Sequence, residues 1–289
     1  MSDVAMPANA TEQDWQAWVG RKETIHEQIA PDRVAALAAT LGADGNHFAG
    51  APLPPGWHWI FFNRFVPRDG LGTDGHPKRG GFLPPVALPR RMWAGGRLTY
   101  DKPLTIGGEG VRESTILKVE AKSGRAGKLV FVTVSHRIAC DGVHCITEEQ
   151  DIVYREAAAP GTPAPPAAPA PQDATWSEEF RPDTVLLFRY SALTANGHRI
   201  HYDQHYARAE ENYPDLVVHG PLTATLLQGF AAAHAGRPLR EFEFRGMSPL
   251  FVSAPFKLEG KGVAGDGREL ELWASGPSSA LAMRASAKF

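Results

Sequence analysis

Cysteine is scarce in this sequence. The 289 residues include only Cys140 and Cys145. Two cysteines are too few for a disulfide framework, and they lack the second pair that a structural zinc site needs. We therefore interpret both as core or half-buried thiols.

Long apolar runs and a large net charge are also missing. No stretch approaches the roughly 20 apolar residues of a membrane-spanning helix, so no membrane partner is expected. Residues 1–14 are polar and acidic and have neither the basic nor the apolar region of a secretory signal, which predicts a cytoplasmic protein. The formal charge of −2 argues against nucleic acid as a partner, because neutralising phosphates needs a net basic face.

The sequence does contain enough apolar residues for a real core. The hydrophobic fraction is 43% and the charged fraction 21%, close to ordinary globular values. The length suggests two domains or a duplicated unit. Ala157 to Pro171 includes six prolines and no charge, a composition that prevents both helix and sheet pairing. We predict an N-terminal domain 1–156, a linker 157–173 and a C-terminal domain 174–289.

The second half shows a definite order of elements. Thr184 to Tyr190 is a compact apolar segment that we predict to be a strand, and a polar, His-rich excursion follows. Gly220 to Ala235 is predicted to be a helix, since Pro221 suits a first helical turn and Gly236 a helix stop. Alternating segments then predict antiparallel strands at 241–245, 254–260, 268–274 and 280–289.

The first half repeats this order loosely. A strand is expected at Glu23 to Ile29, a short helix at Pro31 to Leu41, and a buried helix in the aromatic segment 56–65. A long loop, Pro67 to Pro89, precedes alternating segments that predict strands at 97–100, 113–119, 129–138 and 146–154. One helix wrapped by a curved antiparallel sheet, made twice, is the α+β architecture that this pattern indicates.

Two motifs resemble a known family. The segment from Tyr190 matches the hydratase signature of MaoC-like proteins, with Tyr190, Leu193, Thr194, Ile200, His201 and Ala207 at matching positions. It departs from that signature with Ala195 for Gly, Asn196 for Asp, His198 for Asn and Arg199 for Pro. Residues 76–95 resemble the N-terminal motif of one subgroup. That subgroup contains mitochondrial 3-hydroxyacyl-thioester dehydratases and bacterial mesaconyl-C4-CoA and itaconyl-CoA hydratases.

The resemblance implies a double hot-dog fold, a homodimer, and addition or removal of water on an acyl-CoA. It also implies no cofactor, because CoA is part of the substrate. A short branched dicarboxylic thioester, mesaconyl-C4-CoA or itaconyl-CoA, is the preferred substrate, and citramalyl-CoA the product. A 3-hydroxyacyl-thioester dehydratase of fatty-acid synthesis is the alternative.

The chemistry itself needs a base for water, a donor for the α carbon and a group that stabilises an enolate-like oxygen. His201 is the predicted base, because imidazole titrates near neutral pH. Asp203 or Asn196 is expected to orient His201 or to hold the water. Asn196 cannot ionise, so the residue that replaces the family's carboxylate stays open. The resemblance assigns Gly220, at the start of the predicted helix, to the oxyanion hole, where unpaired amides favour negative charge.

Cationic residues are the remaining candidates for substrate contacts. Guanidinium groups bind phosphates and carboxylates through paired hydrogen bonds, although charge pairs of this kind are also common on solvated surfaces. We expect a distal substrate carboxylate to be read by an arginine. The predicted substrate-binding residues are Lys78, Arg79, Arg90, Arg91, Trp93, Arg199 and His219.

Three other interpretations of the sequence are a metal site, a thioesterase and a binding module. His198, His201 and His205 would share one face of a helix, but Gly197 weakens a helix here and no carboxylate or cysteine stands at a known metal-motif spacing, so no metal is predicted. A thioesterase of the same fold would release free CoA from an enoyl-CoA. A non-catalytic acyl-CoA binding module would bind the ligand without turnover.

Overall fold

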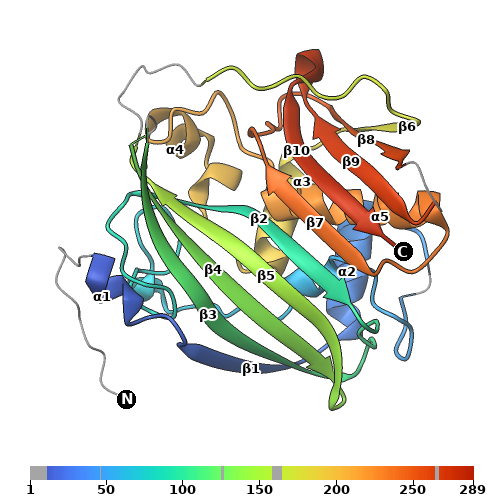
Figure 1. The fold of residues 1–289 in the computed structure, drawn as a ribbon, viewed down its shortest axis with the longest axis horizontal. Helices are drawn as coiled ribbons and strands as arrows, with labels where there is room; N and C mark the ends of the chain where they lie inside the picture. Colours follow the sequence, from blue (N-terminus) through green and yellow to red (C-terminus); the bar gives the residue numbers. More distant parts are fainter. Residues whose placement is uncertain (1–11, 46, 125–126, 158–164, 264–266) are drawn as a thin grey trace.

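The computed structural model describes residues 12–289 except 46, 125–126, 158–164 and 264–266. Within these residues one antiparallel sheet of ten strands has the order β1-β3-β4-β5-β2-β7-β10-β9-β8-β6. Figure 1 shows the sheet curving, with α2, α3 and α5 behind it. The strands are β1 (Lys22–Gln28), β2 (Arg90–Tyr100), β3 (Glu109–Gly124), β4 (Gly127–Cys140), β5 (Val143–Arg155), β6 (Trp176–Phe180), β7 (Glu241–Gly246), β8 (Phe256–Gly262), β9 (Glu269–Ser275) and β10 (Leu281–Lys288).

The main helices lie on one face of this sheet. The helices are α1 (Glu12–Gln16), α2 (Pro31–Leu41), α3 (Thr184–Leu193), α4 (Gln204–Ala209) and α5 (Gly220–Ala235). Helix α5 contacts β7, β8, β9 and β10 and is buried on most sides. Its C-terminus is capped by Gly236 in the left-handed region, as predicted.

The two halves of the chain meet where β2 pairs with β7. Gly95 lies opposite Arg245, and Leu98 lies opposite Phe242. On its other edge β2 pairs with β5. The end of the segment that resembles the N-terminal motif, residues 90–95, therefore lies in the middle of the sheet, beside the C-terminal half.

The prediction of a strand at Thr184 to Tyr190 is wrong, because this segment forms α3. Leu186, Leu187 and Tyr190 are buried while Val185 and Phe188 are exposed, a helical spacing. The carboxylate of Asp183 accepts from the amide of Leu186 at 2.7 Å and caps the helix. A short apolar run cannot distinguish the two structures by periodicity, and the cap was the signal that the prediction overlooked.

The prediction of a buried helix at 56–65 is also wrong. Only a 3-10 turn, η1 (Trp57–Ile60), forms there, and all four of its residues are buried. His58 and Trp59 both direct polar atoms at Glu148, with distances of 3.1 Å and 2.9 Å. Phe61 then takes an extended backbone. Tertiary contacts with β5 therefore override a helical continuation.

The other predicted elements are confirmed with shifted ends. Strands β1, β2, β3, β4, β5, β7, β8, β9 and β10 lie where alternation predicted them, and α2 and α5 have the predicted bounds. The short strand β6 was not predicted. It pairs with the edge of β8, and its exposed, charged sequence has little apolar alternation.

Part of the predicted linker 157–173 lies outside the described residues, namely 158–164. Its end runs along the sheet, because Pro169 bridges to Ala280. Ala170 is 5% exposed and packs with Trp273 and Leu281. The domain boundaries stay a prediction.

Candidate active site

His201 lies in a short turn between α3 and α4. This turn, η3 (Arg199–His201), places the imidazole inside the protein, where the residue is 7% exposed. Its Nδ1 lies 2.7 Å from the carbonyl oxygen of Val217. Because a carbonyl oxygen only accepts, Nδ1 carries the hydrogen of the neutral ring and Nε2 keeps its lone pair.

Burial decides the protonation state of His201. It lowers the pKa of His201 to about 4, and the hydrogen bond to Val217 opposes this effect without cancelling it. The ring is therefore neutral at pH 7. A neutral imidazole with a fixed tautomer and a free Nε2 has the properties of a general base.

His219 supports His201 from behind. The two rings stack with centroids 3.6 Å apart and planes 18° apart. His219 is fully buried, and its Nε2 lies 2.8 Å from the hydroxyl of Ser191. The ring of His219 fills the space between His201 and Tyr190, and its contact with substrate stays a prediction.

The start of α5 adjoins this histidine pair. His219 is the residue before the helix, and Gly220 is its first residue. Amides of a first helical turn lack partners within the helix and favour negative charge. A Cβ built on Gly220 would meet no atom within 4 Å. The space that a side chain would occupy at position 220 is thus open, and the role of Gly220 in an oxyanion hole stays a prediction.

A loop from the N-terminal half docks on the His-rich segment. The amide of Arg199 donates to the carbonyl of Asp74 at 2.9 Å, and its Nη1 donates to the carbonyl of Thr73 at 3.1 Å. Gly75, at φ +88°, approaches Gly197 so closely that a Cβ on Gly75 would lie 1.8 Å from the carbonyl oxygen of Gly197. Only glycine fits this contact.

The docked loop brings a carboxylate to the histidines. Asp74 Oδ2 lies 3.0 Å from Nδ1 of His76, and Oδ1 accepts from the His76 amide at 3.0 Å. The ring of His76 lies 4.2 Å from that of His198, which lies 5.6 Å from that of His201. One ligand-type atom from each of Asp74, His76 and His198 falls within 4.8 Å of the others. Asp74 and His76 are already hydrogen-bonded to each other.

Burial keeps these rings neutral as well. It lowers the pKa of His76, although Asp74 opposes this, and it lowers the pKa of His198 to about 2. Burial acts to raise the pKa of Asp74, but the hydrogen bonds to His76 and the charge interactions with His76 and His198 together outweigh it and hold that pKa below the ordinary value. The cluster therefore consists of one carboxylate and neutral imidazoles at pH 7.

Of the predicted cations, Arg91 faces this cluster. Its charge lowers the pKa of both His76 and His198. Within the described part of the chain, Arg91 forms no ion pair with an acidic side chain. Arg90, by contrast, is paired with Glu211 at 3.2 Å. Arg91 lies opposite Tyr154 in the sheet and acts to lower the pKa of that hydroxyl, so it is a cation beside the histidines without an acidic partner in the described chain.

Several other predicted residues have structural partners. Arg79 donates to the carbonyls of Val86 and Pro89, and Lys78 is exposed. Trp93 packs edge-to-face on Trp59 and Phe244 and donates to the carbonyl of Gly95 at 2.8 Å. These contacts order the loop and the sheet, and their roles toward substrate stay predictions.

Comparison with known proteins fits this site. Residues 56–252 match the model of hydroxyacyl-thioester dehydratase type 2. The chain belongs to this family. Over 274 residues it is 48% identical to mesaconyl-C(4)-CoA hydratase of Chloroflexus aurantiacus, with 94% of this chain and 96% of that protein covered. Over 238 residues it is 33% identical to the mitochondrial hydroxyacyl-thioester dehydratase type 2 of Schizosaccharomyces pombe, with 71% and 77% covered.

Solved structures confirm the predicted fold of this hydroxyacyl-thioester dehydratase type 2 family member. A MaoC-like dehydratase superposes with a TM-score of 0.70 at 17% identity, with 95% of this chain and 99% of that chain covered. A Mycobacterium tuberculosis protein described as having a double hot-dog fold gives 0.57 at 13% identity, with 93% and 96% covered. The chain is therefore a double hot-dog enzyme of the hydro-lyase type, as predicted.

The predicted partners of His201 are placed differently in this family member. Asp203 bonds to Arg199 at 2.7 Å and to the amide of Tyr206 at 3.0 Å, which caps α4. Asn196 accepts from the amide of His198 at 3.1 Å. The carbonyl of Val217, rather than either side chain, orients His201. The Asp203 and Arg199 pair stabilises the turn that carries it.

Sequence reasoning missed Asp74 and gave no role to His76. A carboxylate two residues before a histidine, in a loop rich in glycine, was the available signal. This two-residue pattern is too short to indicate a site unless it is known which distant segment the loop contacts. His198, His201 and His205 do not form a shared cluster in the described structure, because His205 is exposed on α4.

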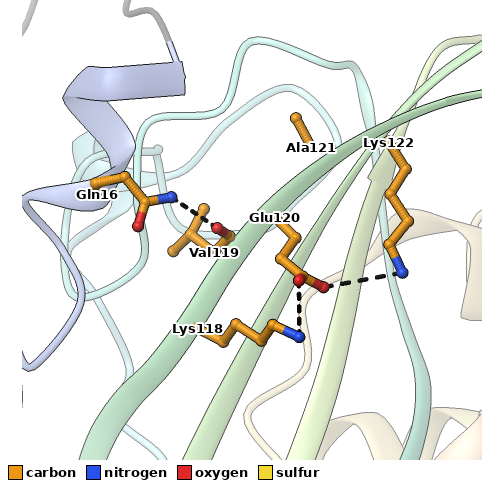
Figure 2. A pocket seen from close by; sticks show the side chains of 6 residues that line it. All are labelled: Gln16, Lys118, Val119, Glu120, Ala121 and Lys122. Atoms are coloured by element: carbon orange, nitrogen blue, oxygen red, sulfur yellow. Dashed lines mark hydrogen bonds and ion pairs between the residues drawn. The ribbon is translucent and has the colours of Figure 1, made fainter.

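A separate hollow lies between α1 and β3, and Figure 2 shows its lining. Glu120 is paired there with Lys118 at 2.7 Å and Lys122 at 3.8 Å. Gln16 donates to the carbonyl of Val119 at 2.8 Å. These groups satisfy one another, and the lining contains no histidine. We do not place the thioester there.

None of the helices in the described residues is both long and apolar enough to cross a membrane.

Proposed function

We propose that this protein reversibly adds water across the 2,3 double bond of a 2-enoyl-CoA. One observation carries the proposal: a neutral His201, held by the carbonyl of Val217, stacks on His219, the residue immediately before α5. Base and helix N-terminus are thereby adjacent. A thioester whose carbonyl oxygen meets the Gly220 amide would present its double bond to His201.

The steps follow from this arrangement. Nε2 of His201 takes a proton from water as the water oxygen bonds to C3. The electrons of the double bond move through C2 onto the thioester oxygen, where the amide of Gly220 and the helix dipole stabilise the negative charge. The imidazolium then returns its proton to C2, and the carbonyl re-forms. No redox change and no cofactor are needed.

The position of Arg91 favours a dicarboxylic substrate. In mesaconyl-C4-CoA the free carboxylate is attached to the carbon that gains the hydroxyl group. An arginine that reads this carboxylate must therefore lie close to the base. Arg91 faces His76 and His198 and has no acidic partner among the described residues. The 48% identity to mesaconyl-C(4)-CoA hydratase supports the same preference. Itaconyl-CoA is the second candidate, with citramalyl-CoA as the product.

A panel of thioesters tests the activity. We expect loss of the conjugated enoyl absorbance, with the hydrated product seen by mass spectrometry. The value of kcat/KM should be highest for mesaconyl-C4-CoA and lower for crotonyl-CoA and long-chain 2-enoyl-CoA. Activity greatest on long 3-hydroxyacyl thioesters would instead favour the alternative function, a dehydratase of fatty-acid synthesis. The Schizosaccharomyces pombe relative is named a hydroxyacyl-thioester dehydratase. Free CoA without hydration would indicate a thioesterase, and binding without turnover a binding module.

Arg91→Ala tests the substrate preference. We expect kcat/KM for mesaconyl-C4-CoA to fall about 10- to 100-fold, because a hydrogen-bonded charge contact contributes about 1.5–3 kcal/mol. The value for crotonyl-CoA, which has no second carboxylate, should change less than threefold.

Arg181→Ala is the matched control, since the side chain of Arg181 is 74% exposed and forms an ion pair with Glu179 on the surface. It should leave both substrates unaffected. Equal losses on both substrates in Arg91→Ala would contradict a carboxylate-reading role.

A further inference from the structure

We propose that Asp74 and His76, on a loop of the N-terminal half, hold the attacking water and compensate the charge that forms on His201, in place of the carboxylate that position 196 lacks. This inference rests on the proposed function. His76 would touch the attacking water, and Asp74 would be its positioning residue. The active site would then be completed by the half of the chain that does not carry the hydratase motif.

The reaction creates a need that His201 alone does not meet. Taking a proton from water makes an imidazolium in a buried place, where an uncompensated charge is costly. Asn196 is neutral, and its side-chain oxygen already accepts from the amide of His198. Two nearby carboxylates are neutralised elsewhere, Asp203 by Arg199 and Glu211 by Arg90. Asp74 is bonded to a histidine of the cluster instead.

The geometry of Asp74 and His76 is that of an oriented base. Oδ2 of Asp74 holds Nδ1 of His76 at 3.0 Å, so Nδ1 carries the hydrogen and Nε2 keeps a lone pair. The second oxygen of Asp74 accepts from the backbone of His76 at 3.0 Å. A carboxylate that fixes the tautomer of an imidazole and stabilises its charged form is a recurring catalytic arrangement.

The loop is held in register with the motif it completes. Arg199 bonds to the carbonyls of Thr73 and Asp74, and Gly75 packs directly on Gly197. These contacts fix the residues on either side of Asp74 against the turn that carries His201. A loop with only a covering function would not require such a close backbone approach at this point.

The sequence of events remains balanced in atoms and charge. His201 removes one proton from water, and Nε2 of His76 accepts a hydrogen bond from the O–H that becomes the product hydroxyl. The carboxylate of Asp74 compensates the positive charge while the imidazolium of His201 exists. When His201 returns the proton to C2, the cluster regains its starting charge.

Titratable and charged groups near His76 come from its own loop, from β2 and from the His-rich segment. They are Asp74 and Arg79 on its own loop, Arg91 on β2, and His198 and His201 on the opposite segment. Asp74 raises the pKa of His76, whereas burial and the two arginines lower it. Removing the carboxylate of Asp74 should therefore lower the pKa of His76. The acidic limb of the pH profile, where His76 becomes protonated, should then move to lower pH.

The experiment compares four variants of the full chain on mesaconyl-C4-CoA. Asp74→Asn and His76→Asn should each lower kcat about 10²-fold with KM changed less than threefold. Asp74→Asn should also shift the acidic limb of kcat/KM downward. Asp74→Asn combined with Asn196→Asp should have a kcat at least tenfold higher than that of Asp74→Asn alone, because a carboxylate is restored at the motif position. Asp69→Asn, in an exposed part of the same loop, is the control and should match wild type.

Each contrary result has one meaning. Variants at 74 and 76 that keep wild-type kcat and pH profile, while His201→Ala is inactive, would overturn the inference and leave the proposed function standing. A double variant whose kcat is no higher than that of Asp74→Asn would contradict the idea that a carboxylate at position 196 can replace that of Asp74. Stoichiometric metal in elemental analysis, with activity lost on chelation, would assign Asp74, His76 and His198 to a metal site instead. A wild-type protein that hydrates no thioester of the panel would remove the proposed function itself.

Discussion

Replacing His201 with alanine is expected to lower kcat for hydration about 10³-fold, within the range that general acid–base groups contribute. The change removes the only group that the proposed steps use to take and return a proton. KM should change little, because the imidazole contacts the attacking water rather than the CoA. Stopped-flow or steady-state loss of enoyl absorbance measures the effect.

His205→Ala serves as the control for this prediction. His205 follows four residues later and is exposed on α4, so its removal should leave kcat within twofold of wild type. Thermal unfolding of both variants shows whether the protein is folded. A folded His201→Ala protein with more than a tenth of wild-type kcat would contradict the assignment of His201 as the base.

Replacing Glu148 with alanine is expected to lower the free energy of unfolding by about 3–5 kcal/mol at pH 7, the cost of removing a buried carboxylate and leaving its hydrogen-bond partners unpaired. Glu148 is 1% exposed. Its carboxylate lies 3.1 Å from Nε2 of His58 and accepts from Trp59 at 2.9 Å and from Gln150 at 2.8 Å. Removing it leaves three polar groups with one partner fewer. Urea denaturation measures the difference.

The pH dependence of this difference is a second signature. Burial acts to raise the pKa of Glu148, but the hydrogen bond and charge of His58 outweigh it and lower the pKa to about 2. Because the folded pKa lies below the ordinary value, the stabilisation is full above the unfolded pKa of about 4.5 and is lost as the pH falls toward 2. The gap between wild type and Glu148→Ala should therefore shrink between pH 4.5 and pH 2.

The neighbouring residue provides the matched control. Glu149 forms a surface ion pair with Arg97 at 2.9 Å, and both side chains are about two-fifths exposed. Exposed pairs contribute little, so Glu149→Ala should cost at most about 1 kcal/mol. Similar losses for the two variants would show that Glu148 is not the buried anchor described here.

The sequence was most informative where periodicity is long or a cap is unambiguous. Helix α5 was predicted to the residue from Pro221 and Gly236, and nine strands were predicted from alternation. The errors fell on two short apolar segments. Residues 184–190 form a helix because Asp183 caps it, and residues 57–60 form only a turn because Glu148 binds His58 and Trp59.

For the site, the sequence indicated His201 and Gly220 but not how they are oriented. The orienting partner of His201 is a backbone carbonyl, that of Val217, and backbone groups carry no side-chain signature. Asp74 and His76 are separated from His201 by more than a hundred residues in the chain. Their proximity depends on which loop docks on which turn.

By itself, the sequence determined the family, the double hot-dog architecture and the reaction class, because a motif at fixed local spacing and the alternation of apolar residues are properties of the chain. Only the tertiary structure decided which charged groups share the site. Arg91 faces the histidines while Arg90 is neutralised by Glu211, and Asp74 reaches the motif through the contact of Gly75 with Gly197. Electrostatic interactions depend on distance and burial, and neither is fixed until the two halves of the chain pack together.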